Sequence, residues 1–361
     1  MSLKPWVVCP VILLLVGVLL VNGCSTGKPA SGEPAKEVLV KVSMQPTFHA
    51  LPTFMAIQRG WDKAAGLKIE SQIYMSGPPQ NEALASNTWE VGAEGSVPAM
   101  LAAIRYGAYI IAISNNDSDC NTLWVKPNSS ILKVKGANPK YPEVYGSAAT
   151  VKGKTILLTT ASNGHYAAVA TLKALGVGEQ DVKLVHMEPT QILPAFEANQ
   201  GDIAQLWTPF DYAAESKGFK EISSGQRAGI FIPSLVLASK KAFEENPDKV
   251  AKWLKLYMRG IAEMKSNPAE SAKVLGAYYK EHGLTLDDKS LAQEFARRPL
   301  YNTNEQLALF ARKDGAPSQI EQWMSDLADF FVQQGRITTA EKEKLMKGNF
   351  INDKIMKMVA Q

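Results

Sequence analysis

Residues 151–212 constrain the fold more than any other part of the chain. They contain three short apolar runs, separated by two segments whose apolar residues recur at helical spacing. The apolar runs are 155–159, 182–186 and 203–207. Strands that alternate with helices predict a βαβαβ unit with parallel strands. Because such sheets bind ligands at the carboxyl ends of their strands, we expect a site in the loops at 160–165, 187–191 and 207–211.

Length, charge and missing motifs narrow the class of protein. A chain of 361 residues, 46% apolar and 20% charged, can form two α/β lobes. The net charge of +4 is small, and no run of basic residues alternates with aromatic ones, which argues against nucleic-acid binding. The four histidines show no HxH or HExxH spacing, and no GxSxG, GxxxxGK[ST] or GxGxxG sequence follows a strand. We therefore expect a binding protein rather than an enzyme, with no metal and no cofactor.

The first 24 residues predict a lipoprotein signal peptide. Lys4 supplies a basic start, residues 6–21 are apolar, and Val21-Asn22-Gly23-Cys24 resembles a bacterial lipobox, in which Cys24 becomes the acylated N-terminus. An uncleaved transmembrane anchor is the alternative, but it needs about 20 apolar residues. Residues 25–36 are rich in Ser, Gly, Pro and Ala, which predicts a flexible tether between the lipid and the folded part.

Cysteine usage limits the chemistry of the folded part. Cys9 lies in the signal peptide and Cys24 would carry the lipid, so Cys120 is the one thiol that remains. A disulfide within the fold and a cysteine-type metal site are therefore excluded. Cys120 could be a reactive thiol, but a small buried side chain beside a binding loop is the favoured interpretation.

The order of short motifs in residues 151–212 resembles a known family. A KGK sequence, a strand, a turn of small residues, a helix, a strand, a PTQ helix, GDIA and WTPF follow one another. This order is similar to the second lobe of solute-binding proteins that serve sulfonate, taurine and nitrate ABC importers, and of their pyrimidine-precursor relatives. The likeness continues near the N-terminus, with a strand at 37–45, a cleft loop at 46–50, a helix at 51–60 and a strand at 66–70.

The resemblance implies an α/β, type II periplasmic-binding-protein fold. Two α/β lobes would be joined by two hinge strands, the first at 123–125 and the second at 231–239. Residues 37–124 and 231–361 would form a discontinuous first lobe, and residues 125–230 the second. Helical patterns after residue 241 predict helices that pack on the first lobe. An unrelated enzyme that begins with a βαβ unit is the alternative.

Helix N-termini from both lobes are the main candidate binding groups. Pro98 suits the first turn of a helix that begins near Ser96, so free backbone N–H groups around Gly95 and Ser96 would face the cleft. Ser162 and Asn163 begin a helix on the opposite side. Such N–H groups suit a sulfonate or carboxylate, and each helix end contributes about 0.3–1 kcal/mol. The alternative is that the serines only cap their helices.

Histidine and aromatic side chains could complete the site. His49 and His165 fall in loops of opposite lobes, where either could donate a hydrogen bond to an anion, unless neighbouring backbone satisfies it. Phe48, Trp207 and Phe210 are expected to be apolar walls that bury the non-polar body of an organic ligand, with structural packing as the alternative.

Acidic loop residues bear on the charge of the ligand. A buried carboxylate facing the ligand costs desolvation unless it meets a cation, so Asp117, Asp119 or Asp211 in the cleft would imply an amino group on the ligand. Solvated loop carboxylates are the alternative. The full set of predicted ligand contacts is Phe48, His49, Gly95, Ser96, Asn116, Asp117, Ser162, Asn163, His165, Gln191, Trp207 and Asp211.

The resemblance, together with the predicted signal peptide, implies the extracytoplasmic substrate-binding component of an ABC importer. It would be a monomer, anchored to the cell membrane through Cys24, and would close two lobes on a small organic anion or zwitterion, either sulfonate- or taurine-like or a carboxylate. Its partner would be an ABC permease. The alternatives are a secreted enzyme or binder of the same fold, acting on a pyrimidine-like or amino-acid ligand, and a surface sensory module without uptake.

Overall fold

The computed structural model describes residues 37–361, which form one compact unit. The predicted signal peptide, the acylated Cys24 and the tether at 25–36 lie outside the described residues. Within residues 37–361, no helix has both the length and the apolar character needed to cross a membrane.

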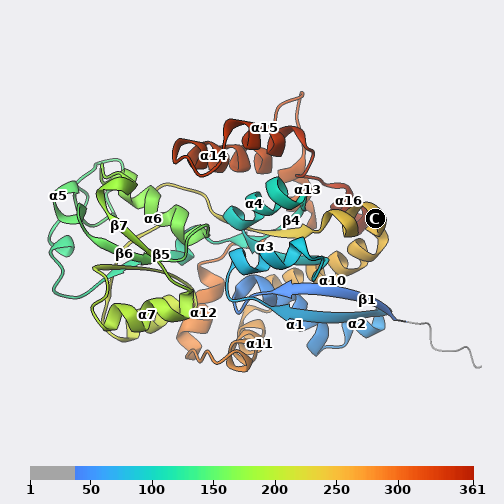
Figure 1. Ribbon diagram of the computed structural model, residues 1–361. Helices are drawn as coiled ribbons and strands as arrows, with labels where there is room; N and C mark the ends of the chain where they lie inside the picture. The colour runs from blue at the N-terminus through green and yellow to red at the C-terminus, as the bar shows by residue number, and fades with distance from the viewer. Residues whose placement is uncertain (1–36) are drawn as a thin grey trace, which may run out of the picture. The chain divides into compact units, whose positions relative to one another are not determined.

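The first lobe is built on a five-stranded sheet with the order β2-β1-β3-β10-β4 (Figure 1). β1 runs parallel to β2 and β3, whereas β10 is antiparallel to both β3 and β4. All six residues of β10 are buried, as expected for a strand whose sheet is covered on both faces. The bounds are β1 (Val38–Met44), β2 (Leu67–Ile73), β3 (Val91–Gly95), β4 (Tyr109–Asn116) and β10 (Pro233–Ala238).

The second lobe is built on a second five-stranded sheet, with the order β7-β6-β8-β5-β9. β6 runs parallel to both β7 and β8, which confirms the βαβαβ unit predicted for residues 151–212. β5 is antiparallel to β8 and completes the sheet together with β9. The bounds are β5 (Asn121–Val125), β6 (Thr155–Leu158), β7 (Lys183–His186), β8 (Ile203–Trp207) and β9 (Lys220–Ser224).

The chain crosses between the two sheets twice, at residues 117–120 and 225–232. The first crossing contains the short helix η2 (Ser118–Cys120). Residues 121–124 were expected in the first lobe, but they pair with β8 and β9 in the second sheet. The chain returns to the first sheet at β10, close to the second hinge strand predicted at 231–239. Both crossings are short, so the two lobes remain close together at this edge.

Helices cover the faces of both sheets. Those of the first lobe are η1 (Phe48–Ala50), α1 (Leu51–Gln58), α2 (Trp61–Ala64), α3 (Gly77–Ala85) and α4 (Ser96–Tyr106). Those of the second lobe are η3 (Ser130–Lys133), α5 (Ala148–Val151), α6 (Asn163–Ala174), η4 (Glu179–Asp181), α7 (Pro189–Glu197) and α8 (Phe210–Ser216).

The C-terminal third of the chain is helical, as the sequence predicts. α10 packs on α1 and α16, and its buried face includes Trp253, Leu254 and Tyr257. The bounds are α9 (Lys240–Glu245), α10 (Pro247–Ser266), α11 (Pro268–Glu281), α12 (Asp288–Ala296), α13 (Thr303–Phe310), α14 (Gln319–Gln333), α15 (Thr339–Lys347) and α16 (Lys354–Ala360). Most of these helices cover the first lobe, but residues of α14 and those that follow α12 also contact the second lobe, which the sequence did not indicate.

C-terminal segments also close the open edge of β4. The Ile110 amide donates to the Phe350 carbonyl at 2.7 Å. Further along, the Gln306 side chain accepts from the Ile113 amide at 2.8 Å and donates to the Ile113 carbonyl at 2.7 Å. Gln306 is completely buried. Its amide therefore replaces a neighbouring strand, which lets an apolar strand lie at the edge of a sheet.

We expect Gln306→Ala to lower the free energy of unfolding by roughly 2–4 kcal/mol, because it leaves two buried backbone groups of β4 unpaired. Urea unfolding measures the change. Gln322→Ala is the control, since the Gln322 side chain is exposed and bonds only to Asp326, and it should change stability by less than about 0.5 kcal/mol. Equal effects of the two variants would contradict the role assigned to Gln306.

Candidate functional site

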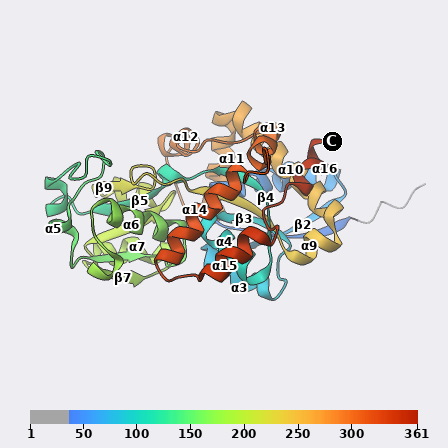
Figure 2. The ribbon, with the colours of Figure 1, turned by 90° about the horizontal axis from the view of Figure 1, so that it is seen from above.

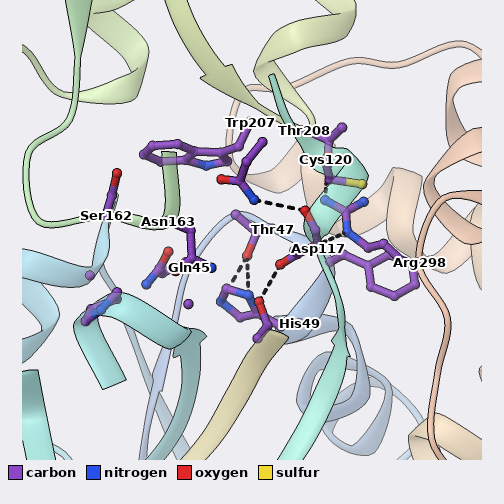
Figure 3. Close-up of a pocket in the computed structure, with 16 residues that line it drawn as sticks. Gln45, Thr47, His49, Asp117, Cys120, Ser162, Asn163, Trp207, Thr208 and Arg298 are labelled. Atoms are coloured by element: carbon purple, nitrogen blue, oxygen red, sulfur yellow. Dashed lines mark hydrogen bonds and ion pairs between the residues drawn. The ribbon is translucent and has the colours of Figure 1, made fainter. Parts of the chain in front are cut away.

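A pocket lies between the two sheets, where the carboxyl ends of β1, β3, β6 and β8 meet (Figure 3). It has about 480 Å³ of empty space, part of it open to solvent. Its wall contains residues of both lobes, of the first crossing and of the C-terminal region. The lining residues are Gln45, Thr47, Phe48, His49, Gly77, Gly95, Pro98, Asp117, Cys120, Asn121, Ser162, Asn163, Trp207, Thr208, Ser234 and Arg298.

The start of α6 forms the second-lobe side of the pocket. Ser162 is the N-cap of α6: its hydroxyl accepts from the His165 amide at 3.2 Å and donates to the Thr159 carbonyl at 2.7 Å. This arrangement places the next residue, Asn163, at the lobe boundary. The Asn163 side-chain oxygen accepts from the Ser96 hydroxyl at 3.2 Å and from the Val97 amide at 3.0 Å.

Asn163 thereby caps α4, a helix of the other lobe. The N-cap position of α4 is Gly95, which has no side chain that could accept from the first N–H groups. A Cβ on Gly95 would lie 2.5 Å from the Asn163 side-chain nitrogen, so only glycine leaves room for this contact. A second contact across the boundary joins the Ser76 hydroxyl, before α3, to the Glu188 carboxylate at 2.9 Å. The two lobes therefore touch beside the pocket.

The loop after β1 forms the floor of the first-lobe side. The Thr47 hydroxyl lies 3.0 and 3.2 Å from the two ring nitrogens of His49. Burial lowers the pKa of His49 to about 4, an effect that nearby Asp117 opposes and Arg298 reinforces. His49 is therefore neutral at pH 7. Two buried tyrosines of the C-terminal helices fix this loop: Tyr257 donates to the His49 carbonyl at 2.7 Å and Tyr278 to the Gln45 carbonyl at 2.6 Å.

A buried arginine from the C-terminal region stands opposite. The Arg298 guanidinium lies 2.6 Å from the Asp117 carboxylate and 2.8 Å from the Glu294 carboxylate, and it donates to the Thr208 hydroxyl. It also lies 4.9 Å from the centroid of the Phe48 ring. Asp117 belongs to the first crossing and Thr208 to the second lobe, so Arg298 joins three parts of the chain at one point of the wall.

The cation in the pocket wall is paired with carboxylates. Arg298 is positive, but two carboxylates face it, and His49 is neutral. Behind the wall, Glu94 is fully buried, and burial raises its pKa well above its usual range. The starts of α4 and α6 supply partial positive charge on one side, while Asp117 lies on the other (Figure 3).

Two aromatic side chains and a thiol supply the apolar part of the wall. Trp207 is partly exposed and stands edge to face with Phe210, at 6.2 Å between ring centroids. Phe48 is buried and contacts Phe295 in the same manner at 5.0 Å. Cys120 is buried, and burial raises the pKa of its thiol far above the usual range. Cys120 is therefore the buried small side chain beside the loop that the sequence favoured.

Seven of the twelve predicted contact residues line the pocket: Phe48, His49, Gly95, Asp117, Ser162, Asn163 and Trp207. Ser96 lies directly behind this wall, where its hydroxyl donates to Asn163. Asn116 accepts from the Ser118 amide at 2.9 Å and holds the crossing segment. These two residues support the pocket from outside.

His165, Gln191 and Asp211 lie away from the pocket. His165 is buried on α6, with its ring 3.8 Å from the Glu179 carboxylate. The Gln191 side chain accepts from the amide of Glu188 at 3.2 Å, within the capping box of α7. Asp211, in the first turn of α8, lies 3.2 Å from Arg297, and burial raises its pKa to about 7. Each side chain is occupied by a structural partner instead.

The predicted ligand contacts did not include the other nine lining residues, although Thr47 and Thr208 fall in loops that were expected at the cleft. The nine are Gln45, Thr47, Gly77, Pro98, Cys120, Asn121, Thr208, Ser234 and Arg298. Arg298 is the most consequential of these, because it is the one cation among the lining residues. A signal was present: two adjacent arginines and a proline, Arg297-Arg298-Pro299, end a helical pattern. Nothing local in that pattern shows that a segment so far along the chain returns to the cleft.

Comparisons with known proteins agree with this architecture. Residues 47–271, more than half of the chain, match the family model described as NMT1/THI5 like. The chain belongs to the NMT1/THI5-like family. It is 31% identical over 332 residues to a Brachyspira hyodysenteriae protein assigned as an ABC transporter periplasmic binding protein, covering 92% of each chain. It is also 26% identical over 298 residues to a Bacillus subtilis protein assigned as aliphatic sulfonates-binding, covering 81% of this chain and 82% of that protein.

Solved structures of two periplasmic binding proteins share the fold. The periplasmic aliphatic sulphonate-binding protein SsuA from Escherichia coli superimposes with a TM-score of 0.66 at 17% identity, over 87% of this chain and 98% of that one. The periplasmic nitrate-binding protein NrtA from Synechocystis PCC 6803 gives 0.66 at 13% identity, over 90% and 89%. The predicted two-lobed periplasmic-binding-protein fold is confirmed.

His49 makes stability depend on pH. Its pKa is about 4 in the folded protein and 6.5 when unfolded, so the unfolded state binds more protons between these values and stability falls as the pH falls through this window. We expect His49→Gln to reduce the loss of unfolding free energy between pH 7 and pH 5 by about 2 kcal/mol, measured by urea unfolding at both values.

Asp211, with its raised pKa, has the opposite dependence in both proteins and cancels in this comparison. The control is Gln322→Ala, because Gln322 is exposed and its side chain has no titratable group. An identical loss of stability in the His49→Gln variant and the unaltered protein would show that His49 is not held neutral by burial.

Proposed function

We propose that this chain is the substrate-binding component of an ABC importer, which captures a small solute between its two lobes and presents it to a membrane permease. The observation that carries the proposal is the pocket itself, whose wall combines residues of both sheets in a member of the NMT1/THI5-like family. Its relatives include proteins named for ABC transport and for sulfonate and taurine binding.

Binding would act through closure of the lobes. A ligand that touches both Gly95 and Ser162 gains contacts only when the lobes are together, so it binds the closed arrangement more tightly and shifts the population toward it. A permease could then distinguish the loaded protein from the empty one. This mechanism requires no bond to be made or broken.

The balance of charge favours a zwitterion over a plain anion. A buried ligand with a net negative charge would find no free cation among the lining residues, because Arg298 already pairs with Asp117 and Glu294. A ligand with both an acidic and an amino group fits better. Its oxyanion would lie at the starts of α4 and α6, its amino group toward Asp117, and its carbon body against Trp207. Taurine has these features.

The remaining parts of the proposal concern location and assembly. Acylation of Cys24 would tether the protein outside the cytoplasmic membrane, within reach of its permease. One copy of the chain would form the complete binding unit.

Two matched probes test the charge of the ligand. Taurine and ethanesulfonate share the sulfonate and the two-carbon body and differ by the amino group. We expect titration calorimetry to show taurine binding about ten-fold or more tightly, and Asp117→Asn to reduce that preference. A preference for ethanesulfonate would contradict the zwitterion assignment.

Trp207 tests the location of the site. We expect Trp207→Ala to weaken taurine binding by about ten-fold, because the variant removes the large apolar surface of the pocket wall. The control is Trp61→Ala, at a tryptophan of α2 outside the pocket, which should leave affinity unchanged. Mass spectrometry of the probe after incubation distinguishes binding from turnover, and a chemically altered probe would favour an enzyme instead.

A further inference from the structure

α6 of the second lobe packs into an apolar cluster of the first lobe. Tyr166, Ala167 and Val169 of α6 share this cluster with residues of α4 and α14. Figures 1 and 2 both place α14 beside α4, with α6 nearby. The buried core of this region therefore extends from one lobe into the other.

Aromatic contacts hold α6 against α14. The Tyr166 and Phe330 rings meet edge to face at 4.6 Å between centroids, and Phe331 lies 6.3 Å from Tyr166. Tyr166 is 6% exposed and Phe330 9%, so this contact is largely shielded from water. Edge-to-face pairs of this kind add to the stability that burial already provides.

An ion pair continues the contact beyond the end of α14. Arg336 pairs with Glu179 of η4, in the second lobe. The His165 ring nitrogen lies 3.8 Å from the same carboxylate. Nearby His165, and then Arg336, lower the pKa of Glu179 against the opposing effect of burial. Glu179 is thus anionic at neutral pH and attracts Arg336.

The opposite end of α14 is fixed to the first lobe and to a crossing. Ile320 and Met324 are buried in the cluster that includes α4 and β10. Trp323 stacks on Phe231 of the second crossing, with 4.1 Å between ring centroids. α14 therefore spans from the first lobe, past the crossing, to the second lobe.

The ligand pocket and this outer contact share the first turn of α6. Asn163 and Tyr166 are three residues apart, so they lie on the same side of the helix. Asn163 reaches into the pocket wall and caps α4, while Tyr166 is held by α14. Any movement of α6 away from α14 would also withdraw Asn163 from α4.

We propose that α14 is a positioning element for the ligand site, in which Tyr166, Phe330 and Arg336 act through α6 to keep Asn163 on α4 and so favour the closed lobes. The ligand-affinity part of this inference rests on the proposed function, whereas the effect on lobe closure does not.

The ion pair provides a test that leaves the core intact. Arg336→Glu places two carboxylates together and should open the ligand-free protein, which small-angle X-ray scattering detects as a larger radius of gyration. Lys342→Glu is the matched control, because Lys342 pairs with Asp329 between α15 and α14 and makes the same change of charge. Arg336→Lys keeps the positive charge and should have the same radius of gyration as the unaltered protein. An equal radius for Arg336→Glu and Lys342→Glu would overturn the proposal.

The aromatic contact provides the second test. We expect Phe330→Ala to weaken taurine binding by about three- to ten-fold in calorimetry, although Phe330 does not line the pocket. Phe243→Ala is the control, since Phe243 is a buried, stacked aromatic residue of the first lobe and should leave affinity unchanged. Equal affinities in the two variants would overturn the proposal. If no probe binds the unaltered protein, the proposed function fails, and the scattering test still decides the role of α14.

Discussion

The buried guanidinium of Arg298 is the interaction on which the arrangement of the pocket most depends. A charge that is 3% exposed is tolerated only where opposite charges and hydrogen-bond acceptors surround it. Arg298 finds them in three places: Asp117 of the first crossing, Thr208 of the second lobe and Glu294 of α12. These parts of the chain must therefore meet at one point, and that point is the pocket wall.

A second constraint acts on the opposite side of the pocket. α4 starts at a glycine and cannot cap itself, so the first N–H groups of the helix require an acceptor from elsewhere. Asn163 of the other lobe supplies it. The contact between the lobes that brings Asn163 to α4 therefore also supplies a hydrogen-bond acceptor at the start of α4. The apolar contact of α6 with α14 adds to this preference from outside the cleft.

Most of the fold follows from local pattern, whereas part of the site does not. Apolar runs predict β6, β7 and β8, and helical spacing predicts α6 and α7. β6 and β8 are mostly buried, and parallel strands buried on both faces have little choice of residue. The same pattern places Ser162 and Trp207 at the pocket.

Side-chain direction and long-range returns of the chain account for the residues that sequence reasoning misplaced. His165 and Gln191 lie in loops or helix starts of the expected kind, but one points to Glu179 and the other closes its own capping box. Arg298 lies 181 residues from Asp117, and no local pattern encodes that contact. The sheets can be predicted from spacing, but which side chains meet between them depends on tertiary contacts.

Native mass spectrometry of the protein as purified tests the central claim most directly, because it identifies a solute that the closed lobes retain without any choice of probe. The account predicts one small bound compound that carries both an acidic and an amino group and that is lost from the Trp207→Ala variant. A retained compound with net charge at neutral pH, or one that Trp207→Ala binds equally well, would contradict it.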